Sequence, residues 1–320
     1  MKTKAEPVFT GNELKGRKFL KLTDLNIQEL GYLLELAGEL KQKHKSGLHE
    51  EPLKAKTLGM LFEKPSTRTR VSFETGIFQL GGSGIFLNSD NLQLGRGESM
   101  ADTAKVLSGY VDGMMIRTFS HEVLEEFAQN ATVPVINGLT DMYHPCQVLA
   151  DLQTIREIKN GLSGVKLAYI GDGNNMAHSL MIGAAMTGMD INIAAPDDYM
   201  PNTSIVQEAL TIAEQTGGHV EVTSDPQAAA EQADVIYTDV WASMGQEDEQ
   251  GNRKQAFSDF QVNVRLCSLA KNDAFFMHCL PAHRGEEVTA DVIDGKQSVV
   301  FQQAENRLHA QKALMMALMS

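Results

Sequence analysis

The run Ser66-Thr67-Arg68-Thr69-Arg70 combines three hydroxyl groups with two guanidinium groups. It follows the apolar stretch Thr57–Phe62, which predicts a short buried strand, and it precedes apolar residues at near-helical spacing. At a helix start several backbone N–H groups lack intrahelical partners, and the helix dipole is positive there. Together these donors could bind a phosphate or another compact oxyanion. A simple N-cap is the structural alternative, but capping does not require two arginines.

Two further polar motifs follow predicted strands. Arg117 ends the apolar run Gly113–Arg117, where a guanidinium usually pairs with a phosphate or a carboxylate; a salt bridge at the rim is the alternative. His144 lies between a strand and a helix and precedes Pro145 and Gln147. Because Pro145 restricts His144 to an extended conformation, the imidazole should point out of the turn. There it could donate to a carbonyl oxygen, act as an acid or base, or only cap the helix.

The second half of the chain carries three weaker motifs. The turn 171–176 resembles a dinucleotide-binding fingerprint, but Met176 replaces the third glycine, so a nicotinamide cofactor is weakly supported. Asp239 follows a predicted strand and could hold an ammonium group or cap the next turn. Cys279 adjoins His278, but neighbouring residues of an extended chain point opposite ways, which disfavours a nucleophilic pair. We expect Cys279 to line a pocket or accept a proton; an inert buried thiol is the alternative.

The composition limits the possible classes of function. Arginine and lysine number 28 against 41 acidic residues, a formal net charge of −13, which argues against sequence-independent binding to nucleic acid. An anionic substrate would then need a local basic pocket. The three cysteines lack C-x-x-C spacing, so we predict no disulfide framework, no zinc site and a reducing compartment. We see no signal peptide and no membrane-spanning apolar run, and we predict a cytoplasmic protein.

The alternation of strand-like and helical patterns predicts an α/β fold with two parallel-sheet domains joined by interdomain helices. We place the first domain at residues 1–147 and the second at 148–320, with a last helix over about 302–319 returning to the first domain. Ligands of such sheets collect at the carboxyl ends of the strands, and the polar motifs above fall there.

Four segments give specific local expectations. We predict a helix over Leu22–His44 capped by Thr23 or Asp24, a polar loop over Glu247–Lys254, a helix over Ser258–Leu269 and a strand over Ser298–Val300.

Together the motifs resemble the aspartate/ornithine carbamoyltransferase family, in the family's order and from about Phe19 to His309. The run 66–70 matches the carbamoyl-phosphate motif, and 144–147 matches the His-Pro-x-Gln motif, with Cys146 where threonine is often found. The resemblance implies two parallel α/β domains in a homotrimer, active sites at subunit boundaries, and no metal or organic cofactor. It also implies transfer of a carbamoyl group to an amine, here within arginine metabolism.

Three features are similar to the ornithine-specific members. Asp239 with Ser243-Met244-Gly245 matches their ornithine-binding loop, Cys279 stands where aspartate-specific members carry alanine, and Gln93 matches the residue given to the neighbouring subunit. Three alternatives stay open: a related enzyme whose acceptor is putrescine or N-acetylornithine, a dehydrogenase-like enzyme, and a non-catalytic relative that binds an anion.

The resemblance implies a role for each matching residue. Phosphate binding is implied for Ser66, Thr67, Arg68, Thr69 and Arg117, with Gln93 from the adjacent subunit. Contact with the carbamoyl group is implied for Arg117, His144, Gln147 and Arg307, with Cys279 and Leu280 lining it, and Pro145 and Cys146 are implied to bind carbamoyl phosphate. Ornithine binding is implied for Asn175, Asp239, Ser243 and Met244. The catalytic set would be Arg117, His144, Asp239 and Cys279.

Overall fold

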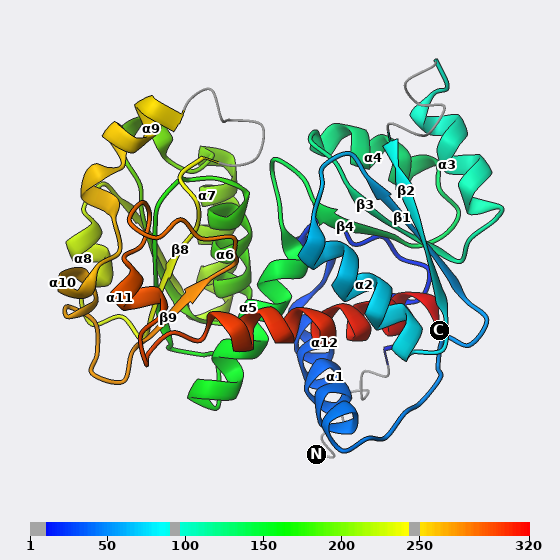
Figure 1. The fold of residues 1–320 in the computed structure, drawn as a ribbon, viewed down its shortest axis with the longest axis horizontal. Helices are drawn as coiled ribbons and strands as arrows, with labels where there is room; N and C mark the ends of the chain where they lie inside the picture. Colours follow the sequence, from blue (N-terminus) through cyan, green and yellow to red (C-terminus); the bar gives the residue numbers. More distant parts are fainter. Residues whose placement is uncertain (1–10, 90–96, 243–249) are drawn as a thin grey trace, which may run out of the picture.

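Two parallel sheets lie side by side in the computed structural model, which describes residues 11–89, 97–242 and 250–320 (Figure 1). The first sheet has the strand order β2-β1-β3-β4 and the second the order β7-β6-β5-β8-β9. Every ladder in both sheets is parallel. The predicted fold class is therefore confirmed. The boundary after residue 147 stays a prediction, because one helix runs through it.

The first half of the chain follows a strand–helix alternation after an opening helix. Its elements are 3-10 turns at Asn12–Leu14 and Leu22–Asp24, then α1 (Ile27–Lys45), β1 (Thr57–Phe62), α2 (Thr67–Gln79), β2 (Ser83–Asn88), α3 (Met100–Ser108), β3 (Gly113–Arg117), α4 (His121–Asn130), β4 (Val135–Leu139) and α5 (Pro145–Lys159).

The second half repeats the alternation and ends with a long helix. Its elements are β5 (Lys166–Ile170), α6 (Asn175–Met186), β6 (Asp190–Ala194), a 3-10 turn at Asp197–Tyr199, α7 (Thr203–Thr216), β7 (His219–Thr223), α8 (Pro226–Ala230), β8 (Val235–Thr238), α9 (Gln250–Ala256), a 3-10 turn at Ser258–Phe260, α10 (Val264–Cys267), β9 (Phe275–His278), α11 (Ala290–Ile293) and α12 (Val300–Met319).

Helix α12 ties the two halves together. It begins next to β9 and then packs against α1, α2 and α5, so its closing residues lie against the first sheet domain (Figure 1). Leu314, Met315 and Leu318 are almost completely buried there. The expected return of the last helix to the first domain is confirmed, and it brings Arg307 to Thr69 at the start of α2.

Four local expectations need correction. Asn26, not Thr23 or Asp24, caps the first long helix, since its side chain accepts from the Glu29 N–H group at 2.9 Å. The predicted helix 258–269 is interrupted because Val262 forms a bridge with Val288. Residues 298–300 form no strand: Ser298 makes a single bridge and α12 has begun by Val300. The predicted loop 247–254 overlaps α9, while residues 243–249 lie outside the described part of the chain.

None of the helices in the described ranges combines the length and the apolar character that crossing a membrane requires.

Candidate functional site

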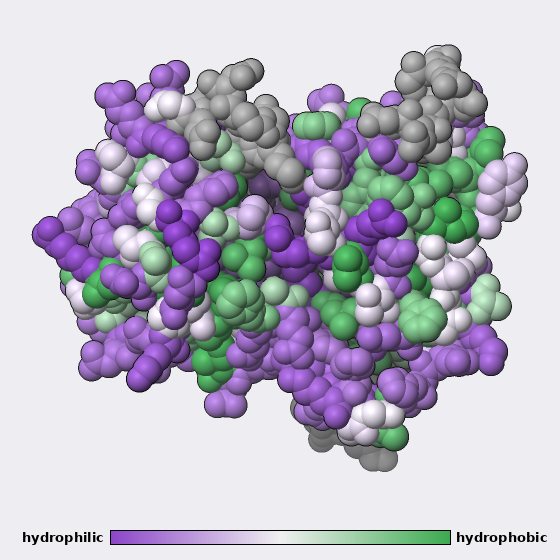
Figure 2. All heavy atoms as spheres, in the orientation of Figure 1, coloured by the Kyte–Doolittle hydropathy of each residue, from purple (hydrophilic) through white to green (hydrophobic). Residues whose placement is uncertain are grey.

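The polar motifs converge at the carboxyl ends of the two sheets. Ser66 follows β1, Arg117 ends β3, His144 follows β4, and Asp239 follows β8. In Figure 2 this region forms a hydrophilic hollow between the two halves. The convergence is a consequence of parallel strands, whose carboxyl ends meet at one edge of each sheet.

Thr69 is the centre of the basic part of the site. Ser66 caps α2 by accepting from the Thr69 N–H group at 3.3 Å, so the capping alternative is also real. The buried Thr69 hydroxyl accepts from Arg307 Nη2 at 2.9 Å and from Arg117 Nη1 at 3.4 Å. Two guanidinium groups from different parts of the chain therefore meet at the N-terminus of one helix, as anion binding requires.

The arginines of this basic part lack carboxylate partners in the part of the chain that the structure describes. Within the described ranges, none of Arg68, Arg117 and Arg307 forms an ion pair with a carboxylate, and the Nε atom of each is buried without a hydrogen-bond partner. Burial, with repulsion from Arg307 and Arg68, lowers the pKa of Arg117 to about 10, so it remains a cation at neutral pH. Arg117 and Arg307 are buried and Arg68 is half-buried, and guanidinium groups without a carboxylate among the described residues of a net acidic protein indicate an anionic ligand.

Backbone irregularity helps to orient Arg117. The ladder between β3 and β4 shifts register between Ile116 and Arg117, and a bulge of this kind re-aims the following side chain. Gly138, on the neighbouring strand, leaves room for Met115, whose sulfur would lie 2.5 Å from a Cβ atom added there. Arg117 is 5% exposed, so the alternative of a rim salt bridge does not hold.

His144 is held beside the same arginines. Burial, with repulsion from Arg307, Arg117 and Arg68, lowers the pKa of His144 well below its usual value, so the imidazole is neutral at neutral pH. Its backbone N–H donates to Ser179 Oγ at 2.8 Å, while Nδ1 is buried and has no partner among the described residues. A neutral imidazole can donate one hydrogen bond to a ligand oxygen.

Behind His144 lies a fully buried polar network around Asp151. The Asp151 carboxyl group receives hydrogen bonds from Gln147 Nε2 at 2.8 Å, Gln303 Nε2 at 2.7 Å and the Tyr237 hydroxyl at 3.2 Å. Burial raises the pKa of Asp151 to about 7, although these hydrogen bonds and the charge of Arg307 oppose the rise. The network joins helices α5 and α12 to strand β8.

The raised pKa of Asp151 predicts a pH effect on stability. Unfolded Asp151 ionises near its usual pKa of 3.8, whereas the folded protein holds the proton up to about pH 7, so this group's contribution to stability is lost as the pH rises between them. Asparagine does not ionise. From pH 5 to pH 8, the free energy of unfolding of Asp151→Asn should rise by about 3 kcal/mol relative to wild type. Urea unfolding at several pH values measures the difference; a constant difference would contradict the raised pKa.

The opposite wall of the hollow carries an acid–thiol pair. Cys279 Sγ donates to Asp239 Oδ1 at 2.9 Å, and Asn174 Nδ2 donates to Asp239 Oδ2 at 3.4 Å. Burial and the Asp239 carboxylate hold the pKa of the Cys279 thiol well above its usual value, so it is protonated at neutral pH. Cys279 and Asp239 follow β9 and β8, at the carboxyl ends of the second sheet, as Arg117 ends β3 of the first. The arrangement could hold a ligand that is anionic at one end and cationic at the other.

The remaining predicted site residues lie around these groups or outside the described part of the chain. Asn175 begins α6, and its amide donates to the Thr140 carbonyl at 2.6 Å. The Cys146 thiol donates to the Asn137 carbonyl at 3.2 Å, and Pro145 is the first residue of α5. Thr67 is exposed at the start of α2, and Leu280 follows Cys279 with a φ of 59°. Gln93, Ser243 and Met244 lie outside the described residues.

Sequence reasoning missed Asn174 and Asp151. Asn174 caps α6 by accepting from the Met176 N–H group at 2.9 Å, and its amide also contacts Asp239. The detectable signal for Asp151 was an acidic residue four positions after Gln147, on a helix that is buried along most of its length.

The fingerprint-like turn does not support a dinucleotide. Gly173 accommodates the chain's own backbone: a Cβ atom added there would lie 2.3 Å from Pro201 N, and the Gly173 N–H donates to the Tyr199 carbonyl at 2.8 Å. The close approach that a pyrophosphate would need is therefore taken by residues 199–201. This removes the argument for a nicotinamide cofactor.

Two clusters of potential metal ligands occur among the described residues: Asp239 with His278 and Cys279, and His283 with Glu286 and Glu287. His278 already uses both ring nitrogens, since Nδ1 accepts from the Leu280 N–H group at 2.9 Å and Nε2 lies 3.2 Å from Glu287 Oε1. Binding a metal through His278 in the first cluster would break one of these contacts.

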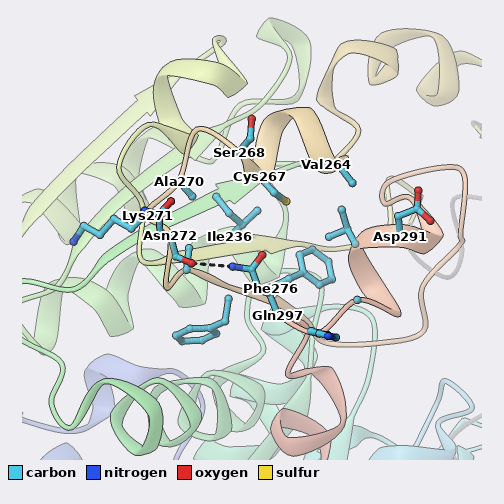
Figure 3. A pocket seen from close by; sticks show the side chains of 15 residues that line it. Ile236, Val264, Cys267, Ser268, Ala270, Lys271, Asn272, Phe276, Asp291 and Gln297 are labelled. Carbon is cyan, nitrogen blue, oxygen red and sulfur yellow. Dashed lines mark hydrogen bonds between the residues drawn. The ribbon is translucent and has the colours of Figure 1, made fainter.

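A separate cavity of about 440 Å³ opens where β9 begins, at the end of the strand remote from the site. Figure 3 shows Cys267, Lys271 and Gln297 around it, with the Gln297 amide donating to the Asn272 carbonyl. It contains none of the predicted site residues.

Comparison with known proteins identifies relatives over nearly the whole chain. Residues 17–157 match the carbamoyl-P binding domain of the aspartate/ornithine carbamoyltransferases, and residues 163–318 match their Asp/Orn binding domain. The ornithine carbamoyltransferase of Oceanobacillus iheyensis is 67% identical over 312 residues, which cover 98% of this chain and 97% of the relative. That of Bacillus subtilis is 59% identical over 97% and 96% of the two chains. The structure of the Pyrococcus furiosus ornithine carbamoyltransferase superposes with a TM-score of 0.93 at 54% identity, covering 96% and 98%.

Proposed function

This chain belongs to the aspartate/ornithine carbamoyltransferase family of transferases, and we propose that it transfers the carbamoyl group of carbamoyl phosphate to the δ-amino group of L-ornithine, giving L-citrulline and phosphate. The observation that carries the proposal is the meeting of Arg117 and Arg307 at the Thr69 hydroxyl, with no carboxylate partner among the described residues, in a chain that also carries the Asp239–Cys279 pair at the carboxyl ends of its second sheet. The relatives named ornithine carbamoyltransferase support the choice of acceptor.

The basic part of the site would bind carbamoyl phosphate. The start of α2, from Ser66 to Thr69, would hold the phosphate with Arg117. The carbonyl oxygen would lie between Arg117 and the neutral His144, and the carbamoyl amino group would donate to Gln147 Oε1. Arg307 would complete this wall, with Cys279 and Leu280 beside it.

The reaction would proceed by direct attack. The neutral δ-amine attacks the carbonyl carbon, and the π electrons of the C=O bond move to the carbonyl oxygen. Arg117 and His144 donate hydrogen bonds to the oxyanion that develops there. The tetrahedral species collapses with cleavage of the C–O bond to phosphate, and the phosphate oxygens take up the amine proton. This chemistry supplies its own leaving group and requires no metal or organic cofactor.

The acidic part of the site would bind the amino-acid end of ornithine. The Asp239 carboxylate would pair with the α-ammonium group, with Asn175 alongside and with the predicted contacts of Ser243 and Met244. The Cys279 thiol, directed at Asp239, would help to position the δ-amine in its neutral form.

The thiol–carboxylate contact gives a test for Cys279. Cys279→Ala removes the donor to Asp239 Oδ1, so we expect the KM for ornithine to rise about fivefold to tenfold, whereas Cys279→Ser, which keeps a donor, should stay closer to wild type. Steady-state kinetics between pH 6 and pH 9 measures both variants. Unchanged turnover and an unchanged pH profile in Cys279→Ala would exclude this role.

We also propose a homotrimer whose active sites are completed by Gln93 of a neighbouring subunit. An apolar surface supports association: Val71 and Phe78 on α2 and Ile85 and Phe86 on β2 are exposed, and Figure 2 shows apolar surface over this domain. Exposed apolar patches of this kind commonly mark interfaces. Light scattering would give the mass; a monomer at micromolar concentration would contradict the proposal. A place in arginine biosynthesis and a cytoplasmic location belong to the same proposal.

The decisive experiment compares acceptors. Release of phosphate and formation of the carbamoylated product would be measured with carbamoyl phosphate and each of ornithine, putrescine, N-acetylornithine and aspartate at equal concentrations. We expect turnover with ornithine at least a hundredfold above the others. Preference for another acceptor would overturn the ornithine assignment but keep the anion site. Binding of carbamoyl phosphate without turnover would favour a non-catalytic relative.

A further inference from the structure

A fixed hydrogen-bond donor lies behind the carbamoyl site. The backbone N–H of His278, at the end of β9, donates to Gln303 Oε1 at 2.9 Å. A backbone N–H group cannot exchange its role with an acceptor, whereas a side-chain amide can present either end. The oxygen of Gln303 must therefore face β9, and its nitrogen must face the other way.

That orientation defines the role of Asp151. Gln303 Nε2 donates to Asp151 Oδ1 at 2.7 Å and to the Tyr237 hydroxyl at 3.0 Å. Oδ1 must accept here whether the carboxyl group is ionised or carries a proton on Oδ2, which lies 3.2 Å from the Tyr237 hydroxyl. Asp151, Gln303 and Tyr237 are all 0% exposed, so water does not compete for these contacts.

The same oxygen then orients Gln147. Gln147 Nε2 donates to Asp151 Oδ1 at 2.8 Å. The reversed amide would place Oε1 against a carboxyl oxygen that already acts as an acceptor, a buried repulsion with no compensating bond. Oε1 is consequently held on the opposite edge of the amide plane, where it is buried and accepts no hydrogen bond from the described residues.

We propose that Asp151 is a positioning residue for substrate selection. Through the hydrogen bonds that link His278, Gln303 and Asp151, it fixes the Gln147 amide with its oxygen available to the ligand. The site therefore prefers an acyl phosphate bearing an amino group over one bearing a methyl group. The inference rests on the proposed function, in which Gln147 contacts the carbamoyl group. The two groups are similar in size, but only the amino group donates a hydrogen bond. A site built to accept that bond rejects the analogue that lacks it.

The test uses two stable phosphonates that differ in this group, phosphonoacetamide and acetonylphosphonate. Isothermal titration of the full-length protein would give the Kd of each for wild type, Asp151→Leu and Asp151→Asn. We expect wild type to prefer phosphonoacetamide. In Asp151→Leu the ratio of the two Kd values should fall about tenfold. The Kd of phosphonoacetamide should rise, and the Kd of acetonylphosphonate should change less than twofold. Asp151→Asn keeps a carbonyl acceptor and should keep the preference.

A merely structural role for Asp151 would weaken the binding of both phosphonates alike, and this outcome would overturn the inference. Full retention of the preference in Asp151→Leu, or its loss in Asp151→Asn, would also overturn it. If Asp151→Leu does not fold, Gln303→Met decides, because it removes the group that orients Asp151; an unchanged preference there would overturn the inference. Wild type that binds neither phosphonate would overturn the proposed function itself, which separates the two failures.

Discussion

Replacing Arg117 with glutamine is expected to lower kcat about a thousandfold and to raise the KM for carbamoyl phosphate about tenfold. Arg117 is buried beside Arg307 at Thr69 and has no carboxylate partner among the described residues, so its charge is available to the ligand. Removing one donor to a developing oxyanion typically costs a factor of 10²–10³, and here a phosphate contact is lost as well. Steady-state kinetics with both substrates varied separates the two effects.

Two variants control for general damage. Arg117→Lys keeps the charge but loses the planar fork, and it should retain a small part of the activity. Arg156→Gln removes an arginine that lies 3.6 Å from Glu35 at the surface, and it should stay within about twofold of wild type. A kcat for Arg117→Gln within tenfold of wild type, in protein with unchanged thermal stability, would rule out oxyanion stabilisation by Arg117.

Asp239→Asn is expected to raise the KM for ornithine about a hundredfold while leaving the binding of carbamoyl phosphate unchanged. Asp239 is 6% exposed, and its two oxygens accept from Cys279 and Asn174, so the carboxylate is held in place for a cation. Removing one partner of a desolvated charge pair commonly costs 2–5 kcal/mol, which corresponds to a factor of about thirty or more.

The control for this variant is Asp198→Asn. Asp198 is exposed after β6, at the same edge of the second sheet, and its loss changes the net charge equally. We expect no more than a twofold change in either KM. If Asp239→Asn weakened carbamoyl phosphate and ornithine to the same extent, the division of the site into a basic and an acidic part would be wrong.

The sheets could be predicted well because their strands are short apolar runs bounded by breakers. The expected strands over Thr57–Phe62 and Gly113–Arg117 coincide with β1 and β3. Parallel strands buried on both faces carry continuous apolar sequence, so local pattern and tertiary environment agree. Because these strands could be predicted, Ser66, Arg117 and His144 could also be placed at one edge of the first sheet.

Predictions from the local sequence pattern failed where contacts between distant segments determine the structure. Val262 has helical neighbours in sequence, but its bridge to Val288 breaks the helix. Asp24 and Asn26 are both residue types that can cap the first long helix. Asp24 does not cap it, because its side chain accepts from the Leu20 N–H group at 2.6 Å. Asp151 was missed because its partners Tyr237 and Gln303 come from β8 and α12, far along the chain.

The return of α12 to the first domain has a consequence for biosynthesis. Thr69 is translated early, but its partner Arg307 is 238 residues away, and the Leu318 carbonyl accepts from the Gly16 N–H group at 2.9 Å. A nascent chain therefore holds the proposed carbamoyl-phosphate site without Arg307 and without the helix that covers its first domain. The ribosome must release essentially the whole polypeptide before the catalytic centre can close around its substrate, and a chain shortened by the last two or three helical turns would leave an apolar face of the first domain uncovered.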